Sequence, residues 1–255
     1  MSGIRLQSKI IYGPILSRRL GRSLGINLLP EKSKTCSFDC VYCQYDKTTD
    51  LSLAPERDHL ATPDEVFEAV EKALKKPRSM DYLTFSGNGE PTIHPDFPEI
   101  VRGVRELLTH YRPDAKLALL SNSSMVTAPA LREVIQSIDA PMMKLDAGDE
   151  ATFQAINQPV EELHLDKVLE GLGKLPHLMI QSVLIDGKDS NDRGAAYEAW
   201  KNALAGLQPE AIHIYSAERP TMSGEVERVS PRRLSEIAEE LQSHYKLNAE
   251  AFWRE

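Results

Sequence analysis

Three cysteines lie close together in the first fifth of the sequence. Cys36, Cys40 and Cys43 are the only cysteines in the chain, and their spacing is C-x3-C-x2-C. An odd number of cysteines in one tight cluster is a poor disulfide framework, whereas thiolates are the protein ligands of iron–sulfur clusters. A full set of ligands would be four thiolates, so three leave one iron open to bind a further molecule. The spacing therefore favours a catalytic [4Fe–4S] cluster.

Two other interpretations of these cysteines stay open. Structural zinc needs four ligands, and His59 or His94 could supply the fourth beside the three thiolates. The cysteines could also be buried and inert. The corresponding function from a different class would be a non-catalytic zinc-binding or iron–sulfur redox-sensing module.

The elements that position this loop follow an alternating pattern. Helical spacing of apolar residues separates the strand-like runs, and Thr62, Pro63 and Glu65 form the start of one such helix as a capping box. Alternation of strand and helix predicts βαβ units and a parallel sheet, either open and doubly wound or closed into a partial barrel. Apolar runs typical of strands occupy 24–29, 82–86, 117–121, 141–145, 178–185 and 211–215. The polar segment 45–61 is expected to be a loop.

Polar residues follow the expected strands, at the edge where ligands of both architectures bind. Each group also has an ordinary explanation, such as a turn, a helix cap or, for Lys144 and Asp146, a mutual ion pair. Gln181 lies among apolar neighbours, and a buried amide needs hydrogen-bond partners that a ligand could supply. The candidate binding residues are Asn88, Gly89, Glu90, Ser121, Asn122, Lys144, Asp146 and Gln181.

The bulk composition limits where the chain works and what it binds. The net charge is −8, so a general nucleic-acid coat is excluded and only a local basic patch could bind RNA or DNA. No apolar run approaches the roughly 18 residues of a membrane span. The N-terminus carries no signal-peptide pattern. Together with clustered thiols, this predicts a cytoplasmic protein with no membrane partner.

The cysteine loop resembles the signature of the radical S-adenosylmethionine (SAM) superfamily, including an aromatic residue, Tyr42, directly before the third cysteine. The segment Gly87-Asn88-Gly89-Glu90-Pro91 is similar to the superfamily's Gly-Gly-Glu-Pro motif, with Asn88 in place of the first glycine. The resemblance implies an α/β fold, namely a partial (β/α)6 TIM-like barrel, and two cofactors, a [4Fe–4S] cluster and SAM. In that superfamily the open iron binds the amino and carboxylate groups of SAM. Reductive cleavage then yields a 5′-deoxyadenosyl radical, which abstracts hydrogen from a substrate.

The same resemblance implies roles for the candidate residues. Asn88, Gly89 and Glu90 would bind the amino group of SAM, and Tyr42 would pack near its adenine. Ser121 and Asn122 would line the SAM site. Independently of the resemblance, Lys144 and Asp146 could contact the SAM carboxylate or ribose, or the substrate, and Gln181 could bind the ligand through its amide.

Three segments resemble one branch of the superfamily, which is described as related to wyosine base formation on tRNA. They are the arginine-rich residues 12–27, residues 144–149 and residues 212–220. Arg18, Arg19 and Arg22 could grip phosphate or carboxylate, or could be solvated partners of surface acids. The 4-demethylwyosine synthases use a second cluster with its own cysteines, and this chain has none to spare. The branch therefore does not define the reaction. The substrate could be a tRNA base, a protein or a small molecule.

Two further expectations concern organisation and partners. We expect one radical SAM domain over 1–255, with an N-terminal extension at 1–23, a barrel core at 24–220 and a C-terminal helical segment at 221–255. The chain has no flavodoxin-like domain, so an external electron donor such as flavodoxin or ferredoxin is implied.

Overall fold

The structure is a computed structural model that describes residues 4–45, 47–218, 221 and 223–254. These residues group into two compact units. The N-terminal unit consists of Leu6–Ser37 and Thr48–Met142, and the C-terminal unit consists of Met1–Arg5, Phe38–Lys47 and Met143–Glu255. The expected boundary of the barrel core at residue 220, and the chain ends at 1 and 255, lie outside the described residues.

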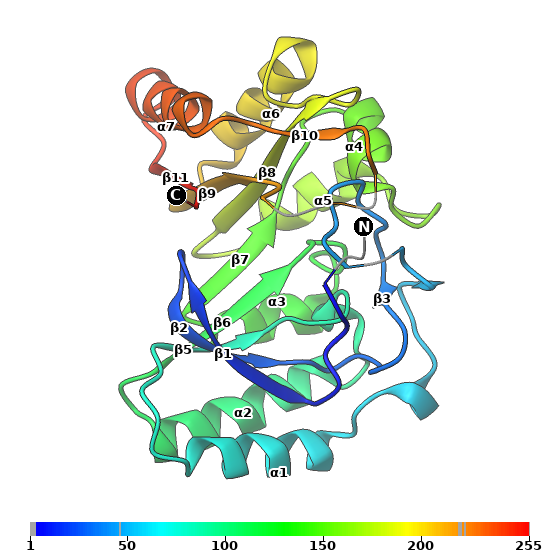
Figure 1. Cartoon of the computed structure of the whole chain (residues 1–255), viewed down its shortest axis with the longest axis vertical. Helices are drawn as coiled ribbons and strands as arrows, with labels where there is room; N and C mark the ends of the chain where they lie inside the picture. Colours follow the sequence, from blue (N-terminus) through cyan, green and yellow to red (C-terminus); the bar gives the residue numbers. More distant parts are fainter. Residues whose placement is uncertain (1–3, 46, 219–220, 222, 255) are drawn as a thin grey trace. The chain divides into compact units, whose positions relative to one another are not determined.

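The N-terminal unit contains strands in the order β1-β2-β5-β6 (Figure 1). β1 (Ile11–Ser17) pairs with β2 (Gly21–Ile26) in antiparallel fashion, and β2, β5 (Tyr82–Phe85) and β6 (Lys116–Ser121) are parallel. A second, two-stranded sheet pairs β3 (Thr35–Cys36) with β4 (Asp50–Leu51). The helical elements are η1 (Arg57–His59), α1 (Pro63–Leu74), η2 (Pro91–Ile93), α2 (Phe97–Tyr111) and α3 (Pro129–Ile135).

The first long helix of this unit begins as the sequence predicts. The Thr62 hydroxyl accepts a hydrogen bond from Glu65 N at 3.3 Å, and the Glu65 carboxylate accepts one from Thr62 N at 2.8 Å. This reciprocal pair satisfies two amides that the first turn of a helix leaves free. Val66 and Val70 then face the core with no exposed surface. Capping and burial together fix where α1 starts and which face it packs.

The C-terminal unit continues the alternation of strand and helix. The boundary between the units falls inside β7 (Ala140–Lys144), whose last residues belong to this unit. β8 (Met179–Gly187), β9 (Ala211–Ser216) and β11 (Ala249–Phe252) are parallel, and β10 (Val226–Arg228) pairs with β8 in antiparallel fashion. Its helices are α4 (Glu150–Asn157), α5 (Leu165–Leu172), α6 (Gly194–Leu207) and α7 (Pro231–Tyr245).

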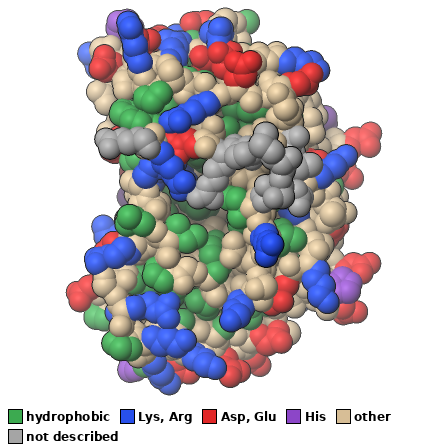
Figure 2. All heavy atoms as spheres, in the orientation of Figure 1, with side chains coloured by type: hydrophobic (Ala, Val, Ile, Leu, Met, Phe, Trp, Pro, Cys, Tyr) green, Lys and Arg blue, Asp and Glu red, His purple; other side chains and the backbone are tan. Residues whose placement is uncertain are grey.

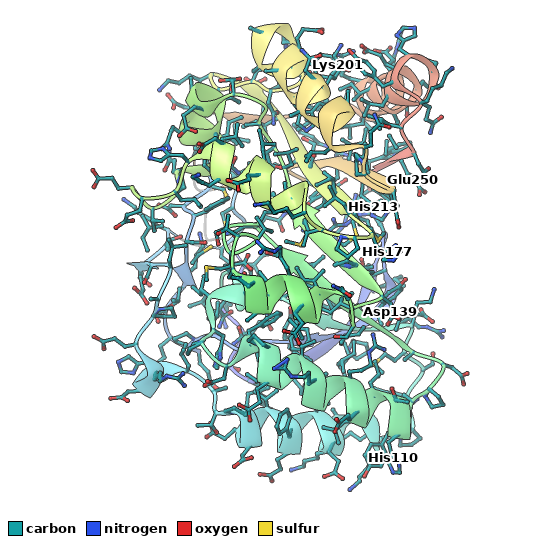
Figure 3. All side chains as sticks on the ribbon, turned by 180° about the vertical axis from the view of Figure 1, so that it is seen from behind. His110, Asp139, His177, Lys201, His213 and Glu250 are labelled. Atoms are coloured by element: carbon teal, nitrogen blue, oxygen red, sulfur yellow. The ribbon has the colours of Figure 1, made fainter. Side chains whose placement is uncertain are left out.

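Two side chains of α6 join neighbouring elements of this unit. The fully buried Trp200 donates its indole N–H to Leu145 O, directly after β7, at 3.0 Å. The Lys201 ammonium lies 2.5 Å from Glu240 of α7, and Figure 3 labels this lysine. The same view labels His213 on β9 and Glu250 on β11, which are direct partners in the strand register. Helix α6 is thus fixed both to the sheet edge and to α7.

All six strands expected from the sequence are present as β2, β5, β6, β7, β8 and β9. Their bounds shift by a few residues; the first begins at Gly21 rather than at 24. The structure adds β1, β3, η2, β10, β11 and α4, which the apolar pattern did not indicate. The described residues of the expected loop at 45–61 form only β4 and η1 as regular elements. No helix among the described residues is long and apolar enough to cross a bilayer.

Candidate functional site

The cysteine loop is divided between the two units. Cys36 ends β3 in the N-terminal unit, whereas Cys40 and Cys43 follow in the segment that belongs to the C-terminal unit. None of the three forms a disulfide; Cys36 is buried and the other two are half-buried. Within the part of the chain that the structure describes, no three His, Cys, Asp or Glu side chains form a preassembled metal site.

In the N-terminal unit, the glycine-rich segment after β5 holds the residue before Cys36. Thr35 N donates to Asn88 O at 3.1 Å, and Glu90 N donates to Thr35 O at 3.3 Å. Gly89 has a φ of +147°, and a Cβ at this position would lie 1.7 Å from Thr35 O. Only glycine allows the two backbones to approach so closely. The motif therefore fixes the start of the cysteine loop through main-chain contacts.

Asn88, the residue that replaces a glycine of the superfamily motif, is fully buried. Its Oδ1 accepts from Gln7 N at 2.7 Å, and its Nδ2 donates to Gln7 O at 2.9 Å and to Pro30 O at 2.8 Å. Both ends of the side-chain amide are thus engaged by this chain's own backbone. The side chain thus connects the segment that precedes β1 to the loop that follows β2 by hydrogen bonds.

Glu90 connects the segment after β5 to the segment after β6. One carboxylate oxygen accepts from Thr92 N at 3.0 Å and from Thr92 Oγ1 at 2.5 Å, and the other accepts from Asn122 N at 2.5 Å. Burial raises the pKa of the Glu90 carboxyl, while these hydrogen bonds act in the opposite direction. The carboxylate therefore ties together two loops that the sequence assigns to the SAM site.

Asn122 brings a side-chain amide to the first cysteine. Its Nδ2 lies 3.6 Å from Cys36 Sγ and donates to Ser37 Oγ at 2.9 Å. Its Oδ1 accepts from Ser124 N at 2.9 Å, which fixes the orientation of the amide. Ser121 is buried and its hydroxyl accepts from Ser123 N at 3.0 Å. Of the two residues predicted here, Asn122 is the one whose side chain contacts a cysteine sulfur.

The C-terminal unit brings Tyr42 and Asp146 together, although they are far apart in the sequence. The Tyr42 hydroxyl donates to Asp146 Oδ2, and Val183 N donates to Asp146 Oδ1 at 2.7 Å. Asn157, the last residue of α4, donates to Asp146 Oδ2 at 2.8 Å, to Tyr42 Oη at 3.2 Å and to Cys40 Sγ at 3.6 Å. Sequence reasoning missed Asn157, because it is the last residue of a helix and does not follow a strand.

Burial dominates the proton affinities of this network. It raises the pKa of the Cys40 thiol to about 11, with Lys144 acting in the opposite direction. It also raises the pKa of the Tyr42 hydroxyl well above its usual value, and the neighbouring Asp146 raises it further. Both groups hold their protons at neutral pH in the metal-free chain. Binding of a metal to Cys40 would release the thiol proton, as is general for thiolate ligands.

Lys144 and Gln181 lie beside this network. The Lys144 ammonium is 3.8 Å from Asp146 Oδ2, and it lies 5.2 Å from the centre of the Tyr42 ring and 5.9 Å from that of Tyr215. Gln181 Oε1 accepts a hydrogen bond from the Tyr215 hydroxyl at 3.2 Å. The ion pair that the sequence left open as an alternative for Lys144 and Asp146 is present. It shares its carboxylate oxygen with Tyr42 and Asn157.

A polar pocket of about 300 Å³ opens beside Cys40 and Cys43 within the C-terminal unit. Its other lining residues are Asp39, Val41, Lys47, Gln158, Lys188, Asp189, Ser223 and Glu225. Three thiols in one loop, an asparagine amide near a cysteine sulfur in each unit, and open space beside Cys40 and Cys43 are compatible with an iron–sulfur cluster. The residues present therefore fit such a cluster.

The structure does not bring the three arginines to the cysteine loop. Arg22 forms a bidentate contact with Asp81, with Nε 3.1 Å from Oδ2 and Nη2 2.8 Å from Oδ1. Arg18 and Arg19 lie in the turn between β1 and β2, before the amino end of β2. The cysteine loop follows the carboxyl end of the same strand. The alternative that these arginines are surface partners of acids applies to Arg22.

His94, one of the two histidines that could complete a zinc site, is occupied by protein contacts. His94 Nε2 lies 2.9 Å from Ala61 O, and His94 Nδ1 accepts from Asp96 N at 3.1 Å. Neither ring nitrogen is left to complete a zinc site with the cysteines. His59 lies in η1 with an exposed side chain.

Comparison with known families agrees with this geometry. The model of the radical SAM superfamily matches residues 31–208, and the chain therefore belongs to this superfamily. It is similar to proteins named UPF0026. The protein of Methanocaldococcus jannaschii is 39% identical over 165 residues, which cover 64% of this chain and 48% of that protein. The protein of Helicobacter pylori strain 26695 is 32% identical over 217 residues, which cover 83% of this chain and 67% of that protein.

Solved structures define the fold. The chain matches TYW1 with a lysine–pyruvate adduct bound, with a TM-score of 0.60 and 16% identity over 88% of this chain and 74% of that one. It also matches Streptococcus suis SuiB bound to S-adenosylmethionine, with a TM-score of 0.63 and 14% identity over 90% of this chain and 50% of that one. The fold is the expected partial (β/α)6 barrel of the radical SAM type. The expected cofactors, a [4Fe–4S] cluster and SAM, are those of the family.

The chain spans only part of several relatives. It covers 48% of the M. jannaschii protein and 31% of a Brachyspira hyodysenteriae protein named GTPase Obg, to which it is 30% identical over 222 residues.

Proposed function

We propose that Cys36, Cys40 and Cys43 hold a [4Fe–4S] cluster whose remaining iron binds SAM, and that the chain catalyses hydrogen abstraction from a substrate. The observation that carries this proposal is the three-cysteine loop, lying inside the family match and contacted by an asparagine amide in each unit. When bound, the reduced cluster supplies the electron that cleaves SAM to methionine and a 5′-deoxyadenosyl radical. The span of the match supports one catalytic domain that includes segments of both units.

The chain's own residues bind, orient and shield this chemistry. In the N-terminal unit, Gly89 and Glu90 shape the main chain where the amino group of SAM would bind, and Ser121 and Asn122 form the adjoining wall. In the C-terminal unit, Lys144 and Asp146 present opposite charges next to each other, which suits the carboxylate and the hydroxyl groups of SAM. Tyr42 is buried and oriented by Asp146, so its ring can pack against adenine without side-chain reordering.

An external reductant such as flavodoxin or ferredoxin would supply the electron. The sequence contains no cysteines beyond the three of the loop, so a second cysteine-ligated cluster cannot relay it within this chain. We also propose that the chain works in a reducing compartment such as the cytoplasm, because its three cysteines lie close together in the sequence and form no disulfide.

A basic groove favours RNA among the substrates left open by the sequence. Six of the seven charged residues between positions 6 and 37 are basic, although the whole chain has a net charge of −8. In the N-terminal unit, a groove of about 510 Å³ is lined by Lys9, Lys72, Lys76 and Arg78, with Glu31 as its acidic residue. Figure 2 shows Lys and Arg side chains close together in the region where Figure 1 draws the end of α1. Clustered cations of this kind bind phosphate backbones.

Two measurements test the proposal. An anaerobic preparation should be brown, contain about four irons per chain and release 5′-deoxyadenosine when dithionite and SAM are added. Comparison of modified tRNA nucleosides between cells with and without the protein then tests the substrate. A missing nucleoside supports RNA, and an unchanged profile rejects it in favour of a protein or small molecule. A colourless protein with one tightly bound zinc would reject the radical mechanism and favour the non-catalytic zinc module.

A further inference from the structure

Each unit places one asparagine amide against one cysteine sulfur. In the N-terminal unit Asn122 Nδ2 lies 3.6 Å from Cys36 Sγ, and in the C-terminal unit Asn157 Nδ2 lies 3.6 Å from Cys40 Sγ. The two asparagines come from different elements, the segment after β6 and the last residue of α4. The contact between an asparagine amide and a cysteine sulfur therefore occurs twice, with asparagines from two different elements.

The neighbours of each amide fix which of its ends faces the sulfur. Asn122 Oδ1 accepts from Ser124 N at 2.9 Å, so its nitrogen must face Cys36 and Ser37. Asn157 contacts the carboxylate of Asp146 at 2.8 Å, and only its N–H₂ group can donate there. Both side chains are buried, with 7% exposure at Asn122 and 1% at Asn157. Each sulfur thus meets a fixed hydrogen-bond donor that belongs to a buried asparagine.

A donor of this kind acts on the electron affinity of a cluster. An N–H group close to a ligand sulfur stabilises the form that carries more negative charge, and reduction adds one negative charge. Burial strengthens this effect, because water does not screen it. Removing the donor makes reduction harder and moves the reduction potential to a more negative value.

We propose that Asn122 and Asn157 are positioning residues that raise the reduction potential of the cluster by donating N–H···S hydrogen bonds to Cys36 and Cys40. This inference rests on the proposed function, because it requires the cluster to be bound. Asn157 also donates to Asp146 and lies 3.2 Å from Tyr42 Oη, so the same amide connects a cluster ligand to residues assigned to SAM. SAM binding next to Asp146 and Tyr42 would therefore alter the hydrogen bond from Asn157 to Cys40.

The test measures the midpoint potential of the reconstituted cluster in Asn122→Leu and Asn157→Leu, which keep the side-chain shape and remove the donor. We expect each potential to become more negative by about 30 to 59 mV, which corresponds to a threefold to tenfold change in a one-electron equilibrium. Iron content is measured on the same samples, so that a change in loading is separated from a change in potential.

The matched controls are two buried asparagines that contact no cysteine. Asn27 in the N-terminal unit donates to Leu29 O at 2.7 Å, and Asn191 in the C-terminal unit donates to Asp146 O at 2.8 Å. Asn27→Leu and Asn191→Leu should lower stability while leaving the midpoint potential at the wild-type value. If the control and test variants shift the potential equally, the role of Asn122 and Asn157 is only structural and the inference is overturned.

A measurement on unmutated protein keeps the inference testable if the leucine variants do not load iron. Protein labelled with ¹⁵N-asparagine and reduced with dithionite should show ¹⁵N hyperfine coupling in pulsed EPR, transmitted through the N–H···S bonds. Absence of this coupling in a fully loaded sample contradicts the inference and leaves the proposed function standing. A wild-type protein that loads no iron removes the proposed function itself.

Discussion

The two units hold their parts of the cysteine loop by different means. In the N-terminal unit the contacts to Thr35 are main-chain hydrogen bonds, and Gly89 is needed because a Cβ would lie 1.7 Å from Thr35 O. In the C-terminal unit the contacts to Cys40 and Tyr42 are made by the polar side chains of Asn157 and Asp146, with Lys144 nearby. The C-terminal part also has main-chain hydrogen bonds, from Asp39 N to Asn157 O at 3.2 Å and from Val41 N to Ile156 O at 3.0 Å, so what distinguishes it is the buried charge of Asp146.

This difference predicts how each part responds to change. A main-chain contact tolerates almost any side chain except at the position where no side chain fits. A buried carboxylate tolerates little, because removing its charge leaves donors around it without an equivalent acceptor. The N-terminal part should therefore be sensitive to size at one glycine, and the C-terminal part to charge at one aspartate.

The largest effect is expected from Gly89→Ala. The added methyl group meets Thr35 O, and the φ of +147° is strained for any residue with a Cβ. We expect the free energy of unfolding to fall by about 3 kcal/mol or more, with loss of iron loading. The control is Gly206→Ala in α6, where nothing lies within 4 Å of an added Cβ. That variant should be neutral or stabilised by up to about 1 kcal/mol. Equal denaturation curves for the two variants would contradict the claim that the close main-chain contact at Gly89 fixes the N-terminal part of the cysteine loop.

Asp146→Asn tests the charged part. Asp146 accepts from Tyr42, Asn157 and Val183 N, and an amide cannot accept at both of its ends. Losing a hydrogen bond to a charged group costs about 1.5 to 3 kcal/mol, which should appear in urea denaturation. SAM binding, followed by calorimetry on the loaded protein, should weaken at least tenfold. The exposed Asp114→Asn in the other unit is the control. If the two variants have the same stability in urea and the same affinity for SAM, the charge of Asp146 does not hold the C-terminal part of the cysteine loop.

A double substitution in the basic groove has an intermediate effect. Lys72→Glu with Lys76→Glu reverses two of the four cations that line it. Binding of tRNA should weaken, and the slope of log K against log salt should fall by up to about 0.9 for each phosphate that is no longer neutralised. Lys167→Glu with Lys174→Glu makes the same change of charge on or next to α5 and should leave the slope unaltered. An equal weakening in both double variants would show that net charge alone governs RNA binding.

The smallest effect concerns the surface pair of Arg22 and Asp81. Hydrogen bonds from Arg22 lower the pKa of Asp81 from its ordinary 3.8 to about 2. Because the folded pKa is depressed, the pair stabilises the fold above pH 3.8 and this contribution is lost as the pH falls toward 2. Urea midpoints measured across this interval should fall slightly more steeply for wild type than for Asp81→Asn. Parallel pH profiles would show that the pair, which is exposed, contributes nothing measurable.

The sequence was sufficient to predict the repeating scaffold. Each of the six expected strands has a counterpart, because buried parallel strands are apolar runs bounded by helices. β1 escaped notice because Gly13 and Pro14 interrupt its alternation and a register shift follows Tyr12. The capping box at Thr62 was readable because all of its atoms lie within one turn.

Contacts between distant residues could not be read in the same way. Tyr42 and Asp146 were named separately, but nothing in the sequence indicates that the phenol donates to that carboxylate. Asn157 carries no signal, since an asparagine at a helix end is an ordinary helix terminus. The sequence left open whether the three arginines bind phosphate or carboxylate or are partners of surface acids. The structure places Arg18 and Arg19 before the amino end of β2 and Arg22 as the second residue of this strand, whereas Cys36 follows its carboxyl end.

The most direct measurement is EPR of the dithionite-reduced, iron-loaded protein with SAM that carries ¹⁵N in its amino group. We predict that SAM changes the spectrum of the cluster and adds a ¹⁵N coupling, because the iron without a cysteine ligand binds the amino nitrogen. Cys43→Ala, which removes one of the three thiolates, should give no cluster spectrum at all. A spectrum unchanged by SAM, or a protein that binds zinc in place of iron, would contradict the proposed mechanism.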